Sequence, residues 1–341
     1  MTLGPPLLSI EDLSLDFDTF DGALHVLDGI NLALQAGETV GIVGETGCGK
    51  SVTVRSILRL LPMPPARFSG GSIRFKECDL TTASERDMRR IRGIEIALIP
   101  QDPMSYLNPV FTVGQQLTDV IRAHRRALPN NDRRGGKTVR ERAIELLAQV
   151  HLPHPEKQLD AYPHELSGGM RQRILIAMAL AGKPSLLIAD EPTTALDVTI
   201  QAQILRLIGE LVDRLGLAVI LISHDIGVVA KVCRRIVVMY AGTVVEDALV
   251  EDLLDHPLHP YTQGLLAAIP RLRAGGRCHL SGIPGNIPNL LAPPAGCRFY
   301  DRCPLRMDIC LTQKPPLVDA GGGQRVACHR YPGPRQEARY G

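Results

Sequence analysis

Tryptophan is absent from this chain of 341 residues, and all aromatic residues together make up only 4% of it. Because base stacking needs aromatic platforms, this shortage argues against nucleic-acid binding. The formal net charge is only +2, so no global field attracts nucleic acid or an anionic membrane. No apolar run approaches the roughly 20 residues that cross a bilayer, and residues 1–10 lack the basic and apolar segments of a secretory signal. We expect a soluble, cytoplasmic protein that meets a membrane only through a partner.

The composition, 45% hydrophobic, suits one large globular domain plus a smaller appendage. Residues 8 to about 35 alternate apolar and polar side chains, which predicts an antiparallel sheet with one buried face. Residues from about 102 to 182 are predicted to be mainly helical, with helices at Val139–Val150 and from Ser167 onward. After about residue 255 proline and glycine become frequent, so we expect a second, irregular unit at 256–341.

Three apolar segments have the length of buried parallel strands. Thr39–Val43 leads into a glycine-rich turn and a predicted helix at Ser51–Leu61. Leu186–Ala189 and Ala218–Ile222 are separated by a predicted helix at Ile200–Leu215. Strand, helix and strand at this spacing predict a parallel crossover, and therefore an α/β fold.

The glycine-rich turn carries the strongest chemical signal of the chain. Its glycines let backbone N–H groups point inward around phosphates, and the following helix N-terminus adds positive potential. A lysine supplies charge to the terminal phosphates, and the serine after it ligates magnesium. An ordinary glycine turn is the alternative, but glycine, lysine and serine all fall at the required offsets. The predicted ATP-binding residues are Gly44, Glu45, Thr46, Gly47, Cys48, Gly49, Lys50 and Ser51.

Two acidic residues, Asp190 and Glu191, follow the predicted strand at Leu186–Ala189. Ligands bind at the carboxyl ends of strands in open α/β sheets. We expect Asp190 to hold magnesium and Glu191 to activate the water that attacks the γ-phosphate. A solvated acidic pair at a strand end is the alternative, which the nearby phosphate loop makes weak. Together the two motifs predict a nucleotide hydrolase, a class with many kinds.

The segment from Leu166 to Arg173, with Ser167, Gly168 and Gly169 in a turn, indicates which kind of hydrolase this is. Here the chain resembles the ATP-binding-cassette family, with every diagnostic motif in order over residues 8 to about 255. In that family this turn caps a helix that reaches the γ-phosphate bound by the opposite subunit. The resemblance implies a P-loop NTPase cassette domain at 1–255, with a parallel core sheet, an antiparallel β subdomain and a helical subdomain at about 102–182.

The resemblance also implies roles for further residues. Gln101 matches the glutamine that contacts magnesium and the attacking water, and Asp197 matches the acid that faces the partner's site. Asp197 also fits a plain helix N-terminal acid, and both roles can hold. His224, after the strand at 218–222, would contact the γ-phosphate and orient Glu191. We therefore expect Glu191, His224 and Gln101 to be catalytic, with Ser51, Gln101 and Asp190 as the magnesium set.

Adenine stacking is expected from an aromatic residue of the N-terminal sheet. Phe17 is the candidate by position and Phe20 the second, with a core role for either as the alternative. Cys48 stands where family members often carry serine. We expect activity to survive this difference and thiol reagents to inhibit.

Two segments, at 102–109 and 256–262, resemble the oligopeptide, dipeptide and nickel importer branch of the family. The tail resembles that branch's C-terminal extension, in which some ATPases hold a [4Fe–4S] cluster. Four thiolates suit zinc or such a cluster, although the spacing lacks paired C-x2-C knuckles. A cluster, zinc and unligated thiols stay open as alternatives, and the cluster is our expectation. The four residues are Cys297, Cys303, Cys310 and Cys328.

The resemblance implies a transport motor for di- or oligopeptides or related solutes at the cytoplasmic face of the inner membrane. The implied partners are a second cassette ATPase in a heterodimer, two transmembrane permease subunits and an extracytoplasmic solute-binding protein. The cargo stays open among dipeptides, oligopeptides, nickel, opines and glutathione. The alternative is a soluble cassette ATPase that acts on nucleic acid or ribosomes. The arginine-rich stretch 122–142 is the one feature of the sequence that favours it. A metal-sensing regulator is weaker still, and we expect no nucleic-acid partner.

Overall fold

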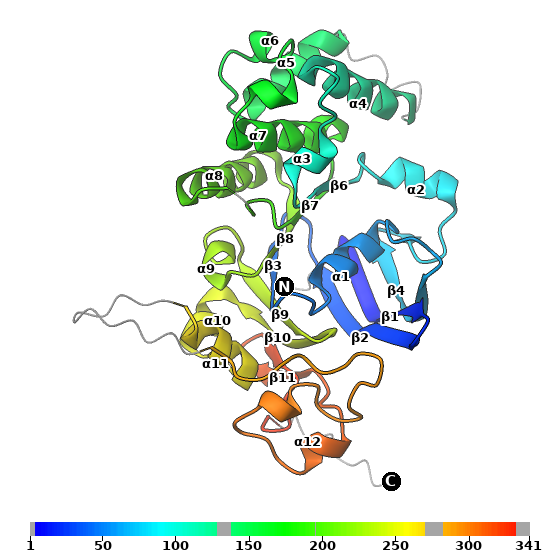
Figure 1. Ribbon diagram of the computed structural model, residues 1–341, viewed down its shortest axis with the longest axis vertical. Coiled ribbons are helices and arrows are strands. Elements are labelled where there is room, and N and C mark those ends of the chain that lie inside the picture. The colour runs from blue at the N-terminus through cyan, green and yellow to red at the C-terminus, as the bar shows by residue number, and fades with distance from the viewer. Residues whose placement is uncertain (1–3, 128–137, 195, 270–281, 332–341) are drawn as a thin grey trace, which may run out of the picture. The chain divides into compact units, whose positions relative to one another are not determined.

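The computed structural model describes residues 4–127, 138–194, 196–269 and 282–331. The chain divides into two compact units. Each unit has its own strands (Figure 1) and its own buried side chains. Unit 1 consists mainly of Thr82–Ile222, with two short N-terminal pieces. Unit 2 consists of Leu8–Ala33, Val40–Thr81 and the chain from Ser223 onward.

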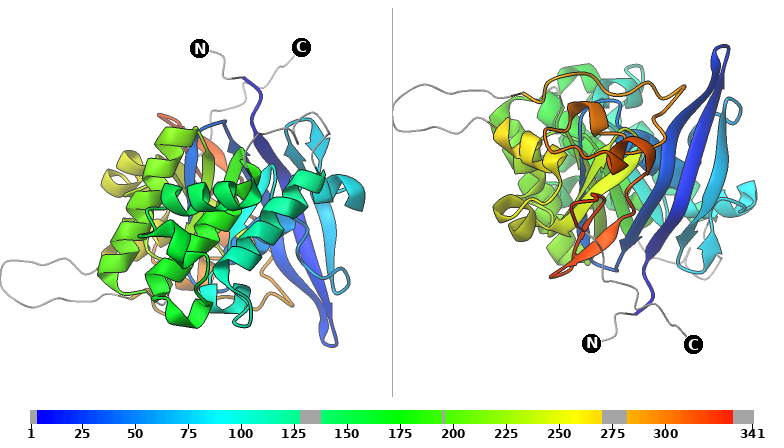
Figure 2. Two further views of the ribbon diagram at one scale, coloured as in Figure 1. Left: turned by 90° about the horizontal axis from the view of Figure 1, so that it is seen from above. Right: turned by 90° about the horizontal axis from the view of Figure 1, so that it is seen from below.

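Unit 2 contains a four-stranded sheet in the order β2-β1-β4-β5, long and twisted in Figure 2. Strand β1 pairs antiparallel with β4, and β4 with β5. The alternation predicted for residues 8–35 is seen on β1 at Leu8 and Ile10 and again at Leu13 and Leu15, all buried, with a register shift between Glu11 and Ser14 that interrupts it. The strands are β1 Leu8–Thr19, β2 Gly22–Leu34, β4 Ala66–Phe75 and β5 Cys78–Asp79.

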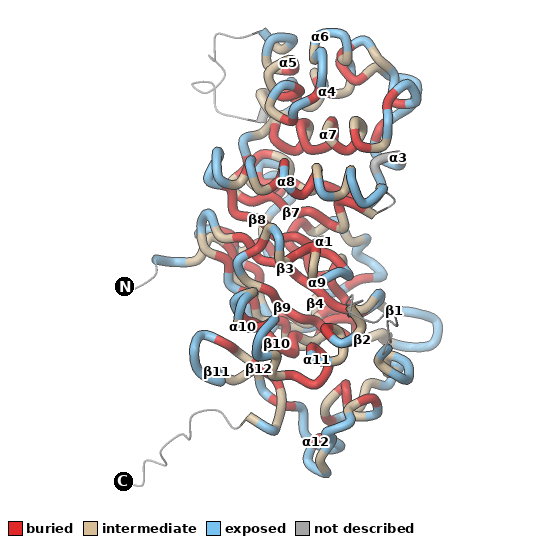
Figure 3. The backbone as a smooth tube through the Cα atoms, turned by 90° about the vertical axis from the view of Figure 1, so that its left-hand side faces the viewer, coloured by how far each residue is buried: buried red, intermediate tan, exposed pale blue. Residues whose placement is uncertain are grey.

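The other strands of unit 2 follow the order β11-β12-β10-β9-β3. Strand β3 lies parallel to β9, whereas β9, β10, β12 and β11 pair antiparallel. All five residues of β3 are buried, as its unbroken apolar sequence predicts (Figure 3). The bounds are β3 Thr39–Val43, β9 Arg235–Tyr240, β10 Thr243–Leu249, β11 Val318–Gly321 and β12 Gln324–Val326.

The C-terminal region is less irregular than its composition predicts. Strand β12 pairs with β10 through Glu246 and Val326. Buried Asp247 of β10 forms ion pairs with Arg235, at 2.9 Å, and with Arg325 of β12. The helices of this part are α9 Ile226–Val229, α10 Val250–Asp255, α11 Pro260–Ala267 and α12 Ile309–Thr312. The tail is thus built into unit 2 by strand pairing and buried charge.

Unit 1 holds three parallel strands, β6, β7 and β8. Residues Leu186–Asp190 of β7 are all buried, and their pairing with β8 confirms the predicted parallel arrangement. Helix α8 connects these two strands and begins at Asp197, whose carboxylate accepts a hydrogen bond from the Ile200 N–H at 2.9 Å. The elements are β6 Ile96–Ile99, β7 Leu186–Asp190, α8 Val198–Leu215 and β8 Ala218–Ser223.

The predicted helical segment at about 102–182 is confirmed within unit 1. Helices α4, α5 and α7 contact one another (Figure 1), and Thr138 and Glu141 form a capping box at the start of α5. Arg133 and Arg134 of the arginine-rich stretch lie outside the described residues. The helices are α2 Glu85–Ile91, α3 Pro103–Tyr106, α4 Val113–Ala127, α5 Val139–Gln149, α6 Pro155–Gln158 and α7 Gly168–Ala179.

Helix α1, Lys50–Ile57 in unit 2, is shorter than the predicted 51–61. Arg59 has a φ of 48°, a left-handed conformation that an α-helix does not continue through. Prolines 62, 64 and 65 follow, and they cannot extend the helix. In the part of the chain that the structure describes, no helix is long and apolar enough to cross a bilayer.

Candidate nucleotide site

The phosphate loop runs from the end of β3 to the start of α1, in unit 2. Gly44 has a φ of 153°, and a Cβ there would lie 2.2 Å from the Met239 carbonyl oxygen. Only glycine therefore fits at this position. The Cys48 N–H donates to the Glu45 carbonyl at 3.2 Å, which closes the turn. The backbone thus takes the tight course that the glycine spacing predicts.

Lys50 is buried at the first position of α1, with 5% of its surface exposed. Its ammonium group donates to the carbonyls of Gly44 at 2.8 Å and Glu45 at 3.0 Å. A buried ammonium needs such partners, because desolvation disfavours its charge. These two hydrogen bonds fix the Lys50 ammonium above the loop, and a positive charge there is of the right sign to attract phosphate oxygens.

Cys48 is fully buried within this loop. Burial raises the pKa of its thiol, and the nearby Lys50 ammonium opposes that effect. Since the thiolate is the reactive form, a raised pKa slows attack by thiol reagents. The burial of Cys48 is therefore unfavourable to the expected inhibition of the ATPase by thiol reagents.

The acidic end of β7 lies in unit 1, where Asp190 is 1% exposed and Glu191 half-buried. The Gln101 side-chain amide donates to Glu191 Oε2 at 2.9 Å, and the Thr194 hydroxyl donates to the same oxygen at 3.1 Å. The structure thus brings together Gln101 and Glu191, which are 90 residues apart in the sequence. Glu191 has a φ of 47°, an unusual value for a residue other than glycine.

The Ser-Gly-Gly turn opens α7, as predicted. The exposed Ser167 hydroxyl accepts a hydrogen bond from the Met170 N–H at 3.3 Å, which makes it the N-cap. The glycines also have a packing role, because a Cβ on Gly169 would lie 2.7 Å from Ile200 Cγ2. For Gly168 the corresponding distance, to Leu196 Cδ2, is 3.2 Å.

The remaining predicted site residues differ in their surroundings. Asp197 is exposed and caps α8, so its alternative role as a helix N-terminal acid is confirmed. His224 is exposed just after β8. Phe17 of β1 is half-buried opposite Ala66, whereas Phe20 is fully exposed. Their roles toward a nucleotide stay predictions.

Two residues that sequence reasoning missed contact the phosphate loop within unit 2. The Tyr261 hydroxyl accepts the Glu45 N–H at 2.8 Å. The Arg302 guanidinium binds both oxygens of the Glu45 carboxylate, at 2.7 and 2.9 Å. The segment at 256–262 and the cysteine-flanked run at 297–303 stood out in the sequence, but nothing in them indicates what they contact.

Tyr261 is positioned by a buried polar network on β10. Glu246 accepts the N–H groups of Leu258 at 2.8 Å and His259 at 2.9 Å. His259 Nδ1 in turn accepts the Tyr261 N–H at 3.1 Å and caps α11. Burial lowers the pKa of His259 to about 3, so the ring is neutral at physiological pH. Burial also raises the pKa of Glu246, opposed by these hydrogen bonds.

The four predicted metal-binding cysteines line one small pocket together with His259 and His329. All four are free thiols, and burial raises the pKa of Cys297 to about 11. Among the described residues, no three or more His, Cys, Asp or Glu side chains are arranged to hold a metal ion. The predicted [4Fe–4S] site at Cys297, Cys303, Cys310 and Cys328 is therefore not supported.

The fold and the phosphate loop first define a class. A parallel α/β core whose strand β3 feeds a lysine-bearing glycine loop is that of a P-loop ATPase, and the Ser-capped α7 is typical of the cassette type. The family model "ABC transporter" matches residues 27–194, and "Oligopeptide/dipeptide transporter, C-terminal region" matches 245–310.

Curated relatives resemble the chain over nearly its whole length. "Probable peptide ABC transporter ATP-binding protein y4tR" of Sinorhizobium fredii is 50% identical, with 95% of each chain covered. "Oligopeptide transport ATP-binding protein OppD" of Bacillus subtilis is 49% identical over 91% of this chain and 85% of its own. The chain therefore belongs to the ATP-binding subunits of ABC transporters, and it is a transport-coupled ATPase.

Solved structures show the same cassette fold. CbiO1 from Clostridium perfringens, described as part of the ABC transporter complex cbiONQ, superposes with a TM-score of 0.61 at 28% identity, over 74% of this chain and 92% of its own. The cassette MJ0796, a dimer bound to ADP and Pi, gives 0.60 at 26% identity, over 71% of this chain and 98% of its own. The predicted α/β cassette fold is confirmed.

Proposed function

We propose that this chain is the ATP-hydrolysing subunit of an ABC importer for dipeptides or oligopeptides. The observation that carries the proposal is the match of residues 245–310 to the oligopeptide/dipeptide transporter C-terminal region. The names of the relatives with about 50% identity speak for the same cargo. The experiment at the end of this subsection distinguishes peptides from nickel, opines and glutathione as the transported solute.

Phosphate binding is assigned to the loop residues 44–51, with Lys50 on the terminal phosphates. Magnesium is assigned to Ser51, Gln101 and Asp190, because hydroxyl, amide and carboxylate oxygens are the hard ligands that this ion prefers. When bound, the ion neutralises charge on the β- and γ-phosphates. We further assign adenine stacking to Phe17, and contacts with nucleotide held by a partner subunit to Ser167, Gly168, Gly169 and Asp197.

Glu191 is proposed as the general base of hydrolysis. Water attacks the γ-phosphorus, the bond to the ADP oxygen breaks, and the water proton passes to the Glu191 carboxylate. Gln101 and Thr194 both donate to Glu191 Oε2. Two donors on one oxygen fix the orientation of the carboxylate. His224 is proposed to contact the γ-phosphate.

We place the chain at the cytoplasmic face of the inner membrane, held there by two permease subunits. A second cassette ATPase completes a heterodimer, and an extracytoplasmic solute-binding protein delivers the cargo. Family membership supports these partners. The division into a cassette domain at 1–255 and an extension at 256–341 is kept as a proposal, and the match beginning at residue 245 favours a boundary near it.

The [4Fe–4S] cluster stays a proposal that rests on the resemblance of the tail, because the four cysteines share a pocket but, among the described residues, are not arranged to hold a metal ion. Its chemistry would lie outside ATP hydrolysis, so we assign it to folding of the tail. Iron and sulfide are to be measured on anaerobically purified protein. About four of each per chain would support the cluster, and the absence of both would remove it.

The transport assignment is tested by co-purification with the membrane subunits, followed by mass spectrometry of the ligand carried by their solute-binding protein. The reconstituted complex should hydrolyse ATP faster when the loaded binding protein is added. Peptides as the carried ligand support the proposal. If nickel, an opine or glutathione is bound instead, the assigned cargo changes and the ATPase assignment is unaffected. ATP hydrolysis that never responds to permease or binding protein contradicts it.

A further inference from the structure

Within unit 2, two arginines of the C-terminal region hold the phosphate loop: Arg302 contacts it directly, and Arg298 contacts the β9–β10 turn beside it. Arg298 and Arg302 lie four residues apart in the run that Cys297 and Cys303 enclose. Arg302 forms a two-pronged ion pair with Glu45, the second residue of the loop, at 2.7 and 2.9 Å. Planar, bidentate pairs of this kind fix geometry as well as adding energy.

The Arg302 side chain is buried and fixed by several hydrogen bonds. Its side chain is 5% exposed. Nε donates to the Pro284 carbonyl at 2.9 Å, and an η-nitrogen donates to the Ile283 carbonyl at 3.0 Å. The guanidinium also lies 5.6 Å from the centre of the Tyr240 ring. The hydrogen bonds to Glu45 raise the pKa of Arg302, so its charge is permanent. The protein thus holds a fixed cation against the loop.

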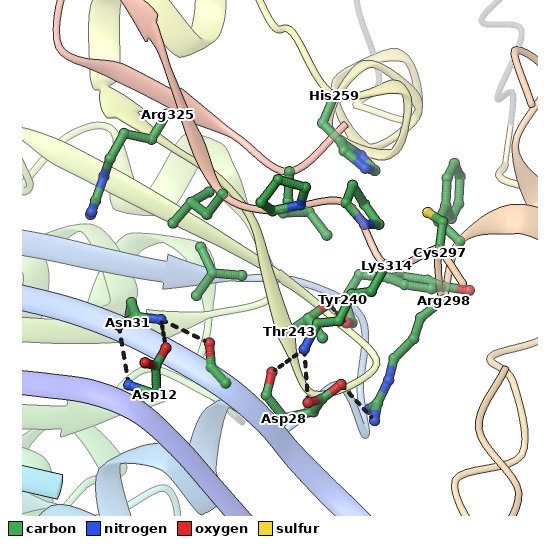
Figure 4. Close-up of a pocket in the computed structure, with 18 residues that line it drawn as sticks. Asp12, Asp28, Asn31, Tyr240, Thr243, His259, Cys297, Arg298, Lys314 and Arg325 are labelled. Atoms are coloured by element: carbon green, nitrogen blue, oxygen red, sulfur yellow. Dashed lines mark hydrogen bonds and ion pairs between the residues drawn. The ribbon is translucent and has the colours of Figure 1, made fainter. Parts of the chain in front are cut away.

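Arg298 supports the loop from another side, through the turn between β9 and β10. Its guanidinium is buried, donates to the Ala241 carbonyl and pairs with Asp28 at 3.2 Å. The next residue, Gly242, donates its N–H to the Cys48 carbonyl at 2.9 Å. Figure 4 shows Arg298 and Lys314 converging on Asp28, at the edge of a cavity of about 530 Å³.

We propose that Arg302 is a positioning residue of the nucleotide site: through Glu45 it holds the phosphate loop in its ATP-binding shape, assisted by Arg298 and Tyr261. The C-terminal region thereby sets the affinity for ATP. Neither arginine is assigned contact with the nucleotide itself. The inference rests on the ATPase activity assigned above and adds a role that the cassette motifs do not contain.

The expected signature follows from the physics of preorganisation. A loop held in its bound shape loses less conformational freedom when the ligand binds, so its affinity rises. The chemical step depends on Glu191 and its neighbours, which these contacts do not touch. Loss of the Arg302–Glu45 pair should therefore raise the KM for ATP about tenfold and leave kcat within about twofold.

The test compares four variants of the full-length chain with the wild type. Arg302→Met removes the fork and keeps the bulk of the side chain, and Arg302→Lys keeps only a point charge. Glu45→Gln removes the charge from the other partner, and Arg302→Met is combined with Glu45→Gln in the fourth. Arg306→Met is the matched control, because Arg306 contacts the Tyr300 ring and not the loop. ATPase kinetics and binding of a fluorescent ATP analogue are the readouts.

We expect a raised KM for ATP in Arg302→Met and in Glu45→Gln, and a smaller increase in Arg302→Lys. The double variant should lose no more affinity than Arg302→Met alone, and Arg306→Met should keep the wild-type KM. A wild-type KM in Glu45→Gln or in Arg302→Met overturns the inference. If Arg302→Met does not fold, Glu45→Gln decides alone, since Glu45 is 29% exposed. Absence of ATP hydrolysis in the wild type rejects the proposed function instead, so the two failures are distinguishable.

Discussion

The two parts of the ATPase machinery are built in different ways. The phosphate loop in unit 2 is buried at Gly44 and from Cys48 to Lys50 and exposed at Thr46 and Gly47, and side chains from α11 and the C-terminal tail hold it. In unit 1, Gln101, Ser167 and Asp197 are exposed, and Glu191 is half-buried. The loop is thus held by neighbouring side chains, whereas several side chains assigned to hydrolysis and to a partner subunit are open to solvent. The difference predicts that changes at the phosphate loop alter affinity for ATP and that changes at Gln101 and Glu191 alter turnover.

Glu191→Gln should have the largest effect and show the contrast most clearly. Loss of the base should lower kcat by about 10²- to 10⁴-fold, with ATP binding preserved. Single-turnover hydrolysis and ATP binding are to be measured on one preparation. Glu210→Gln is the control, because Glu210 of α8 forms exposed ion pairs with His151 and Arg206 and belongs to no assigned site. Hydrolysis near the wild-type rate would show that another group activates the water.

Gly44→Ala should instead damage binding. Its Cβ would lie 2.2 Å from the Met239 carbonyl oxygen, and its φ of 153° is unfavourable for alanine. Because the backbone must shift, we expect the affinity for ATP to fall about tenfold or more. Gly209→Ala is the control, since nothing lies within 4 Å of a Cβ at that helical position. Calorimetric binding that stays unchanged in Gly44→Ala would mean that the loop tolerates displacement.

Gln101→Ala removes one of the two donors to Glu191 Oε2 and leaves Thr194 in place. We expect kcat to fall about tenfold, because the carboxylate is less well oriented, with ATP affinity within about twofold. Steady-state kinetics with exposed Gln313→Ala as the control measure this. A weakened affinity with normal kcat would reverse the assignment of Gln101 to turnover.

The smallest effect concerns acid stability through His259. Its pKa is about 3 when folded and 6.5 when exposed. Since the unfolded chain takes up the proton first, stability falls as pH drops through 6.5. Between about pH 7.5 and 5.5 the loss is about 1.4 kcal/mol. His259→Asn keeps a side-chain acceptor for α11 but does not titrate, so its melting temperature should depend less on pH.

The comparison for His259 is made as a difference between wild type and variant at each pH. Glu246 titrates in both proteins and therefore cancels. A difference of about 2 °C or more in the acid-induced shift of melting temperature is expected. Identical pH dependence in the two proteins would mean that His259 is protonated as easily in the folded chain as in the unfolded one.

Local sequence pattern predicted most of the fold. Unbroken apolar runs gave the bounds of β3 and β7 closely, because strands buried on both faces need no polar residues. Ser167 and Asp197 were predictable as helix starts, since their side chains cap helices in any context. The family resemblance assigned both Gln101 and Glu191 to the attacking water, but the hydrogen bond between their side chains was not predicted.

What could not be predicted depends on pairings between distant residues. Glu45 and Arg302 are 257 positions apart, and neither residue type indicates a partner. The tail was expected to be irregular because glycine and proline hide its short strands, whereas pairing of β12 with β10 and the buried Asp247 order it. Four nearby cysteines suggested a metal site, but their spacing cannot reveal whether the thiols surround one ion.

The central claim is that the lysine-bearing loop binds ATP and supports its hydrolysis. It is tested most directly by Lys50→Ala, with ATP binding and hydrolysis measured on purified protein beside the wild type. Removing the buried ammonium leaves the phosphate charge uncompensated, so both activities should fall by roughly 10²-fold or more. Normal ATP binding and normal hydrolysis in Lys50→Ala would contradict the account.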